Sequence, residues 1–329
     1  MHDLTYLEAQ SVKEAIALKR EHGSDCVFIA GGTNEIYLMK RGVRKPKFLI
    51  NIKSIRGLND LRSDQGELII GSMVRISELE NSKEVIRNYP MLSHCAGKIA
   101  SPQIRNVATV GGNLSQEVWC WYLTEGFDCW MNGGTHCFAP GGDNRYHHSV
   151  DGGYICLAIH PSDLATAFLA LDVQIDVAGE EGERRIGIGE LLPGFSKVEG
   201  RLKQNALKSD EIITQVHVPA SAAGSRGLFL KNAMRESFDF AISSIALSMT
   251  LEGNFCKDVK IAIGGVSTRP FRAARSESVL RGNELAEQLF EKASDVAFDR
   301  EIPLSMNSYR IRLTKELLRQ GLLELYSLR

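Results

Sequence analysis

The sequence carries almost no net charge and no long apolar run. Its 39 Lys and Arg residues nearly balance 40 Asp and Glu residues, which leaves a formal net charge of −1 at pH 7. A nucleic-acid-binding surface would need a basic excess, and a membrane span would need about 18 consecutive apolar residues. With 329 residues, of which 43% are hydrophobic, the chain is long enough for two or three domains with their own cores. We therefore expect a globular protein with no nucleic-acid partner and no membrane span.

Several common signatures are also missing. The sequence has no G-x-x-x-x-G-K-[ST] segment, which argues against a P-loop, and no G-x-G-x-x-G dinucleotide fingerprint. The first ten residues, MHDLTYLEAQ, mix polar and apolar types and do not resemble a signal peptide. We therefore expect a cytoplasmic protein, although a signal on a partner subunit would still allow export.

Cysteine is concentrated in one stretch of the chain. Four of the seven cysteines, Cys120, Cys129, Cys137 and Cys156, follow the spacing C-x8-C-x7-C-x18-C. The residues between them are rich in glycine, aromatics and histidine and lack the apolar periodicity of a helix or strand. Because a long irregular loop inside a compact domain needs something to hold it, we expect the four thiols to converge on one centre.

Three kinds of centre fit these four cysteines. Disulfides suit secreted chains, and an odd total of seven cysteines fits them poorly. Zinc sites usually pair ligands two to four residues apart, and no C-x-x-C pair occurs here. A [4Fe–4S] cluster takes four cysteines, but the tightly spaced ferredoxin run is absent. Spacing alone does not separate zinc from iron–sulfur. We expect His136, His147 and His148 to be exposed loop residues, because a four-cysteine site is already complete.

Apolar patterning predicts a small α/β unit at the start of the chain. Strands are expected at 4–7, 26–30 and 47–52, with helices after Ser11 and over 35–42. A strand bent at Gly71 (67–76), helices broken near Pro90 (77–100) and a helix running into a strand (164–177) follow. The small, flexible residues of 220–227 indicate a domain boundary. Beyond it we expect strands at 228–234 and 261–267, an ambiguous segment at 240–254, and mostly helices after Ala274.

Two glycine-containing loops suggest a phosphate-bearing ligand. IAGGTNEI (29–36) lies between an expected strand and helix, where paired glycines would let backbone amides face a pyrophosphate. ATVGGN (108–113) contains a second pair of glycines that could act in the same way. An ordinary turn capped by Thr33 or Asn34 would also explain the first loop. Two such loops favour a long ligand with phosphates in its middle, such as FAD.

Three charged residues are further candidates for flavin contacts. Asp163 stands at an expected helix start, where it would cap the helix or accept a hydrogen bond from a ribityl or ribose hydroxyl. Lys231 and Arg235 would each be either a surface charge or a cation near the flavin pyrimidine ring, where it would raise the flavin potential.

Taken together, five segments resemble the FAD-binding (medium) subunit of the xanthine dehydrogenase, or molybdenum hydroxylase, family. They are, in order, AGGTNEIYLMK, SPQIRNVATVGGN, HPSD, DEIITQVHVP and LKNAMRESFDFAISSIA, and SPQIRNVATVGGN is the most specific. The resemblance covers nearly the whole chain. It implies an α+β fold: an FAD-binding domain of the PCMH type over 1–222, with subdomains at about 1–58 and 59–222, and a C-terminal domain over 223–329. That last domain would resemble the CO dehydrogenase flavoprotein, with an antiparallel sheet and helices.

The resemblance also implies a set of FAD contacts and no catalytic residue of the chain's own. The implied contacts are Ile29, Ala30, Gly31, Gly32, Thr33, Asn34, Glu35, Ile36, Thr109, Val110, Gly111, Gly112, Asn113, Asp163, Ile213 and Lys231.

The cysteine loop, over 118–158, departs from most members of the family. It resembles an insertion in the flavin subunits of 4-hydroxybenzoyl-CoA reductase and of the periplasmic aldehyde oxidoreductase. There, four cysteines ligate an extra [4Fe–4S] cluster near the flavin. This resemblance favours iron–sulfur over zinc and implies that Cys120, Cys129, Cys137 and Cys156 are the ligands.

The resemblance implies an electron-transfer role within a complex. A molybdopterin-containing large subunit would perform the substrate chemistry, and a small subunit with two [2Fe–2S] clusters would relay electrons to this chain. An external carrier such as ferredoxin would complete the route. We favour oxidation of an aldehyde or aromatic heterocycle over the alternative of a 4-hydroxybenzoyl-CoA reductase, in which electrons would flow in the reverse direction. Two alternatives come from other functional classes. One is a stand-alone flavin oxidase, and the other is a non-catalytic scaffold without FAD whose loop is held by zinc.

Overall fold

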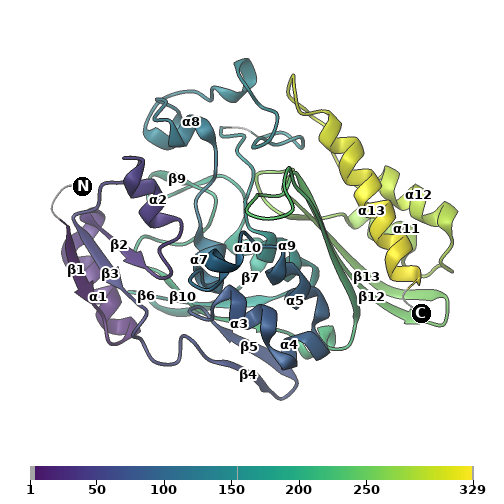
Figure 1. Cartoon of the computed structure of the whole chain (residues 1–329), viewed down its shortest axis with the longest axis horizontal. Coiled ribbons are helices and arrows are strands. Elements are labelled where there is room, and N and C mark those ends of the chain that lie inside the picture. The colour runs from purple at the N-terminus through teal and green to yellow at the C-terminus, as the bar shows by residue number, and fades with distance from the viewer. Residues whose placement is uncertain (1–3, 154, 328–329) are drawn as a thin grey trace.

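The computed structural model describes residues 4–153 and 155–327. An α/β unit at the N-terminus stands at one side of the molecule, and long helices from the C-terminal part stand at the other (Figure 1). Strands and helices of a central part lie between them, so the expected α+β class is confirmed. Within the described ranges, no helix combines the length and apolar character that crossing a bilayer requires.

The N-terminal unit is a parallel three-stranded sheet in the order β1-β3-β2. Its elements are β1 (Thr5–Glu8), α1 (Val12–His22), η1 (Gly23–Asp25), β2 (Cys26–Ile29), α2 (Glu35–Lys40) and β3 (Phe48–Asn51). Ser11 caps α1 by accepting a hydrogen bond from the Glu14 amide at 3.1 Å, and Gly23 ends the helix with a positive φ of 55°. The predicted strand–helix–strand–helix–strand order is therefore confirmed.

The central part is built on an antiparallel five-stranded sheet in the order β4-β5-β10-β6-β7. These strands are β4 (Leu61–Asp64), β5 (Glu67–Gly71), β10 (Ile212–Val218), β6 (Gln174–Gly179) and β7 (Gly182–Gly187). The strand predicted over 67–76 was too long, because the chain leaves the sheet after Gly71. A Cβ atom at Gly71 would lie 2.2 Å from the Leu58 carbonyl oxygen, so only glycine fits this close approach.

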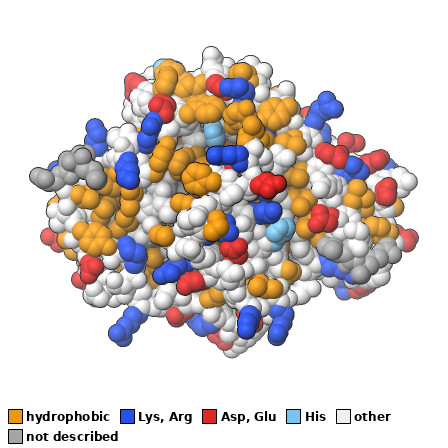
Figure 2. All heavy atoms as spheres, viewed as in Figure 1, with side chains coloured by type: hydrophobic (Ala, Val, Ile, Leu, Met, Phe, Trp, Pro, Cys, Tyr) orange, Lys and Arg blue, Asp and Glu red, His pale blue; other side chains and the backbone are white. Residues whose placement is uncertain are grey.

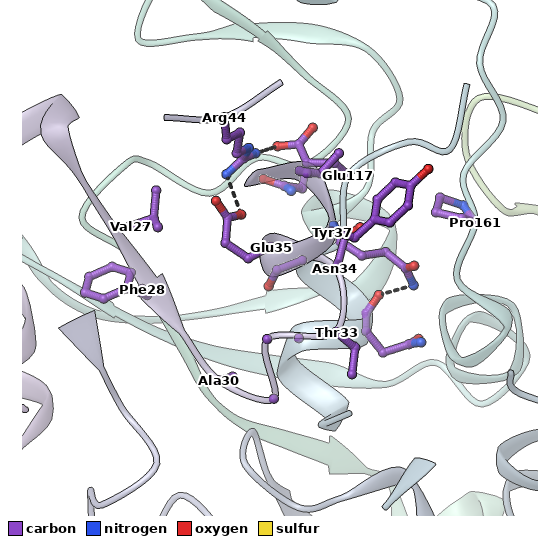
Figure 3. Close-up of a pocket in the computed structure, with 18 of the residues that line it drawn as sticks. Val27, Phe28, Ala30, Thr33, Asn34, Glu35, Tyr37, Arg44, Glu117 and Pro161 are labelled. Carbon is purple, nitrogen blue, oxygen red and sulfur yellow. Dashed lines mark hydrogen bonds and ion pairs between the residues drawn. The ribbon is translucent and has the colours of Figure 1, made fainter. Parts of the chain in front are cut away.

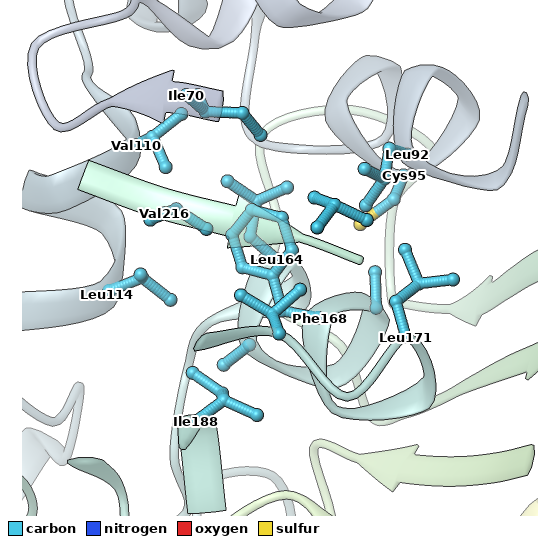
Figure 4. Packing of buried hydrophobic residues seen from close by; sticks show 14 of the residues in the cluster. Ile70, Leu92, Cys95, Val110, Leu114, Leu164, Phe168, Leu171, Ile188 and Val216 are labelled. Carbon is cyan, nitrogen blue, oxygen red and sulfur yellow. The ribbon is translucent and has the colours of Figure 1, made fainter. Parts of the chain in front are cut away.

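Helices pack against this sheet and build the largest core. They are α3 (Ile76–Asn81), α4 (Lys83–Asn88), α5 (Pro90–Gly97), α6 (Pro102–Arg105), α7 (Val110–Ser115), α9 (Asp163–Ala170) and α10 (Ile188–Leu191). Phe168 of α9 is fully buried at the centre of this core, where Val216 of the sheet and Leu92 of α5 surround it (Figure 4). The helical segment predicted over 77–100 breaks at two places, at Ser82 and at Tyr89, just before Pro90.

The cysteine loop and a nearby hairpin complete the central part. The loop contains only short elements: α8 (Trp121–Thr124), η2 (Trp130–Asn132) and η3 (Ala139–Gly141). The hairpin pairs β8 (Ser196–Val198) with β9 (Arg201–Lys203). The expected lack of regular structure in the loop is thus confirmed apart from these single turns.

The C-terminal part is an antiparallel four-stranded sheet in the order β11-β12-β13-β14, with helices on it. After η4 (Ala220–Ala222) come β11 (Arg226–Asn232), β12 (Ser243–Glu252), β13 (Phe255–Gly264), β14 (Phe271–Arg272), α11 (Ala274–Leu280), α12 (Glu287–Asp295) and α13 (Tyr309–Ser327). The ambiguous segment 240–254 is therefore largely strand. The boundary placed between 222 and 223 stays a prediction, since Phe229, Ala246 and Ala262 join the core of the central part.

A buried arginine ties the C-terminal helix to the rest of the chain. Arg310, in the first turn of α13, is fully buried. Its guanidinium donates hydrogen bonds to the carbonyl oxygens of Ile242 at 2.7 Å and His148 at 2.7 Å, and to that of Gly265. These carbonyls belong to the start of β12, the cysteine loop and the end of β13. One side chain therefore satisfies acceptors from three separate segments.

We expect replacement of Arg310 by methionine to destabilise the fold. The change leaves the carbonyl oxygens of Ile242 and Gly265 buried without their Arg310 donor and removes one of the two donors to the His148 carbonyl oxygen, so the free energy of unfolding should fall by about 3 kcal/mol. Chemical denaturation followed by circular dichroism measures this quantity. The matched control is Arg312→Met, at an exposed position two residues further along α13. This change should alter the free energy of unfolding by less than about 0.5 kcal/mol. Equal effects of the two changes would contradict the role of Arg310.

Candidate functional site

A cleft of about 1370 Å³ gathers most of the residues predicted to contact FAD. Both glycine loops line it, together with Asp163 at the start of α9, Ile213 of β10 and Lys231 of β11. Two of the predicted residues lie within the described ranges but do not line the cleft. Ile36 is 42% exposed, and Val110 is fully buried. The cleft therefore joins segments from all three parts of the molecule.

The first glycine loop packs closely against the segment that precedes the second glycine loop. A Cβ atom at Gly31 would lie 2.2 Å from the Val107 carbonyl oxygen, so this position tolerates no side chain. Gly32 has a φ of 73°, a left-handed conformation that favours glycine. The paired glycines thus serve two purposes, a close approach of two backbone segments and a sharp turn into α2.

The second glycine loop begins α7 and is fixed from both sides. The Thr109 hydroxyl accepts a hydrogen bond from the Gly112 amide at 3.2 Å and caps the helix. A Cβ atom at Gly111 would lie 2.7 Å from the Cβ atom of Ser72, so this loop is in direct contact with the residue that follows β5. Ser162, the N-cap of α9, donates a hydrogen bond from its hydroxyl to Asn113 Oδ1 at 2.6 Å.

Three buried polar atoms of lining residues lack a protein partner. Asn34 Oδ1, Glu35 Oε1 and Ser72 Oγ are buried and make no hydrogen bond with any part of the chain that the structure describes. Buried polar groups in native proteins are nearly always paired. A ligand with several hydroxyl and amide groups, such as FAD, would supply the missing partners, so the residues present fit this cofactor.

An ion network stands beside these unpaired atoms. Arg44 bonds to Glu35 Oε2 at 3.0 Å and also to Glu117 Oε1 (Figure 3). Burial raises the pKa of Glu35, and the Arg44 guanidinium opposes that change. Arg44 therefore occupies one oxygen of Glu35, while the other is free to meet a ligand.

Asp163 and Lys231, which also line the cleft, form a buried ion pair. Lys231 Nζ lies 2.7 Å from Asp163 Oδ2, and each side chain is only 6% exposed. The ammonium also donates to the carbonyl oxygens of Lys98 at 3.1 Å and Asp239 at 2.8 Å. All three N–H groups of the Lys231 ammonium therefore donate to acceptors within the protein. Ser162, rather than Asp163, is the N-cap of α9.

The four loop cysteines line one small cavity. Cys120, Cys129, Cys137 and Cys156 enclose it together with residues of the same loop. All seven cysteines are free, which argues against the disulfide alternative. Burial raises the pKa of Cys120 to about 11 and raises that of Cys156 further. These thiols therefore stay protonated at neutral pH unless a metal centre replaces the proton.

The cavity is not arranged around a single ion. No group of three or more His, Cys, Asp or Glu side chains in the described ranges is placed to hold one metal ion. Four sulfurs around one zinc would lie about 3.8 Å apart, as follows from Zn–S bonds of about 2.3 Å in a tetrahedron. Three of the four thiols are buried and that of Cys137 is half-buried, and the arrangement gives no support to a zinc ion.

The expectation that all three loop histidines are exposed was wrong for two of them. His136 is exposed, but His147 is half-buried and lines the cleft, while His148 is fully buried and lines the cysteine cavity. Residues 147–149 pair with 157–159, through Ser149 N to Leu157 O at 2.8 Å and Ile159 N to His147 O at 3.1 Å. Burial lowers the pKa of both His147 and His148 to about 4, so both imidazoles are neutral at pH 7.

The cleft and the cysteine cavity share a wall. Leu123, Trp130 and Met131 line both spaces. Trp119 precedes Cys120 in sequence and lines the cleft, where it stacks on Tyr37 with ring centroids 4.5 Å apart. The loop also presents apolar groups outward: Phe127 is 43% and Trp130 40% exposed, and hydrophobic side chains gather on this upper part of the molecule (Figure 2).

Sequence reasoning missed several lining residues. Ser72, Tyr37, Trp119 and Phe240 all line the cleft, yet none of them belongs to a glycine loop or a spacing pattern. The Trp119 ring lies between those of Tyr37 and Phe240, with centroids 4.5 and 5.0 Å away.

Comparison with known proteins matches two families to successive parts of the chain. A family described as the FAD binding domain in molybdopterin dehydrogenase matches residues 2–221, and one described as the CO dehydrogenase flavoprotein C-terminal domain matches residues 229–325. The aldehyde oxidoreductase FAD-binding subunit PaoB of Escherichia coli (strain K12) is 32% identical over 98% of each chain. The carbon monoxide dehydrogenase medium chain of Hydrogenophaga pseudoflava is 26% identical over 89% of this chain and 85% of its own.

Solved structures support the fold. Quinoline 2-oxidoreductase from Pseudomonas putida 86 superposes with a TM-score of 0.77 at 20% identity, covering 98% of this chain and 97% of that chain. A carbon monoxide dehydrogenase from Hydrogenophaga pseudoflava gives a TM-score of 0.76 at 24% identity, with 99% and 98% covered. With an FAD-binding family matched over residues 2–221 and a full-length relative at 32% identity, the chain belongs to the FAD-binding medium subunits of the molybdenum hydroxylase family and is an oxidoreductase subunit.

Proposed function

We propose that this chain houses FAD and a [4Fe–4S] cluster and relays electrons between partner subunits and an external carrier during oxidation of an aldehyde or an aromatic heterocycle. The observation that carries the proposal is the common wall of Leu123, Trp130 and Met131, because it makes the cleft and the cysteine cavity direct neighbours in one chain. FAD, when bound, supplies the exchange between one-electron and two-electron transfers. No residue of this chain is proposed to act on the organic substrate.

In this proposal the cleft binds FAD through the residues of the two glycine loops. The backbone of Gly31 to Asn34 and of Thr109 to Asn113 would meet the phosphates, because the paired glycines have no side chain to block a close approach. Asn34, Glu35 and Ser72 would pair their unsatisfied oxygens with the cofactor. Lys231 would act through Asp163: burial raises the pKa of that carboxyl group, and the Lys231 ammonium opposes the change and holds the group in one orientation.

The cluster is proposed to bind to Cys120, Cys129, Cys137 and Cys156. Two facts support this assignment: the four thiols line one cavity, and all four are free. Burial of Cys120 and Cys156 would exclude water from their side of the centre. The short turns α8 and η2 place Cys120 and Cys129 directly before their first residues, which fixes the backbone at both positions.

The proposed partners are a molybdopterin-containing large subunit and a small subunit with two [2Fe–2S] clusters. An exposed apolar surface on the cysteine loop, with Phe127 and Trp130, suits contact with another protein. The name of the Escherichia coli relative, an aldehyde oxidoreductase subunit, favours an aldehyde as the substrate class.

The purified complex should therefore reduce ferredoxin or an artificial acceptor when an aldehyde is supplied, while this chain alone should not. Lasting flavin reduction by aldehyde in the isolated chain would instead favour a stand-alone oxidase.

Replacement of Ser72 by alanine tests the placement of FAD. Because the Ser72 hydroxyl is proposed to pair with the cofactor, its loss should weaken FAD binding by about tenfold, equivalent to roughly 1.4 kcal/mol for one buried hydrogen bond. Flavin fluorescence during titration of the apoprotein measures the dissociation constant. Ser244→Ala is the matched control, since Ser244 Oγ is also buried without a partner but lies on β12 outside the cleft. A Ser72→Ala protein with unchanged affinity would contradict this contact.

Replacement of Cys129 by serine tests the cluster. The variant should lose iron and acid-labile sulfide, because a hydroxyl is a poor substitute for a thiolate ligand, while most FAD stays bound. Iron, sulfide and flavin assays on anaerobically purified protein give the three stoichiometries. Cys256→Ser, at a buried cysteine outside the loop, should leave all three unchanged. If wild-type protein contains zinc without sulfide, the cluster assignment is wrong even though the cysteine ligands are right.

A further inference from the structure

One histidine approaches the sulfur of a proposed cluster ligand. His148 Nε2 lies 3.4 Å from Cys120 Sγ, within hydrogen-bond distance for sulfur, and both side chains are buried. Among the described residues, no other side chain makes a hydrogen bond to any of the four loop sulfurs. The contact therefore distinguishes Cys120 from the other three cysteines.

The hydrogen in this contact must come from the imidazole when the cluster is present. A cysteine sulfur bound to iron carries no proton, whereas an imidazole always has at least one N–H. The other ring nitrogen, Nδ1, is buried and makes no hydrogen bond within the described chain. Placing the proton on Nε2 thus gives the ring its one hydrogen bond, to an electron-rich acceptor.

The backbone of His148 is held from two directions. Its carbonyl oxygen accepts hydrogen bonds from Arg310 Nη1 at 2.7 Å and from Asn307 Nδ2 at 3.1 Å. Asn307 Nδ2 also donates to the Ser149 carbonyl oxygen at 3.1 Å. His148 further pairs with Ala158 in an isolated antiparallel bridge, two residues beyond Cys156. The ring is therefore fixed between the C-terminal helix and the last cysteine.

We propose that His148 donates an Nε2–H hydrogen bond to the Cys120 sulfur and thereby raises the reduction potential of the four-cysteine centre. The inference rests on the proposed function, since it needs a cluster at these cysteines. Reduction adds negative charge that is shared with the ligand sulfurs, and a donor aimed at one sulfur stabilises the reduced state more than the oxidised state. His148 is thus a positioning and tuning residue that does not itself carry electrons.

The test compares cluster potentials in the wild type, His148→Phe and His148→Gln. Phenylalanine keeps a ring but removes the donor, and glutamine retains an N–H. An anaerobic redox titration followed by electron paramagnetic resonance gives the midpoint potential, with iron, sulfide and FAD measured in parallel. We expect His148→Phe to lower the reduction equilibrium constant by about tenfold, which is about 59 mV for a one-electron couple, and glutamine to restore part of it. His136→Phe, at an exposed position in the same loop, should leave the potential unchanged.

A His148→Phe protein with full iron content and the wild-type potential would overturn the inference while leaving the proposed function intact. Absence of a cluster from the wild type would instead refute the proposed function. A measurement that needs no stable variant uses wild-type protein labelled with ¹⁵N-histidine. Pulsed electron paramagnetic resonance of the reduced centre should then detect a weak coupling to an imidazole nitrogen. A spectrum without any such coupling would also overturn the inference.

Discussion

The close approach of two backbone segments at Gly31 is the constraint on which the cleft depends. The position of a Cβ atom there is 2.2 Å from the Val107 carbonyl oxygen, so the first glycine loop lies directly on the chain that leads into the second. The second loop is fixed in turn by its contact with Ser72 and by the bond from Ser162 to Asn113. These contacts bring the parallel N-terminal sheet, the central sheet and α9 to one place. The cleft is therefore a product of backbone packing rather than of a single binding motif.

Burial determines the chemistry of both spaces. In the cleft it leaves Asn34, Glu35 and Ser72 with unpaired oxygens, which favours a ligand rich in polar groups. In the cysteine cavity it raises the pKa of Cys120, which favours the protonated thiol until a metal centre displaces the proton. The same low-polarity surroundings would strengthen a hydrogen bond to a sulfur, which is the physical basis of the role proposed for His148.

The C-terminal part has a structural task in addition to covering the central core. Arg310 and Asn307 hold the carbonyl oxygens of His148 and Ser149, and Asn144 Nδ2 bonds to Ser305 Oγ at 3.1 Å. The second half of the cysteine loop is thus attached to the turn before α13. Since the first half forms the wall shared with the cleft, the loop connects the flavin cleft to the C-terminal helix. An inserted loop with few regular elements is stable here because its backbone acceptors are satisfied by distant side chains.

The sequence by itself determined the order of most helices and strands and the types of residue available for chemistry, although not every boundary. Ser11 and Gly23 marked the ends of α1, the paired glycines marked both loops, and the order of five segments identified the family, because these features depend on local backbone preferences and short motifs. The sequence did not determine which residues meet. The burial of His148, the pairing of Asp163 with Lys231 and the unpaired hydroxyl of Ser72 each join positions far apart in the chain or depend on what surrounds them. Only the packing of the sheets and helices decided these contacts, since burial and proximity are properties of the folded whole.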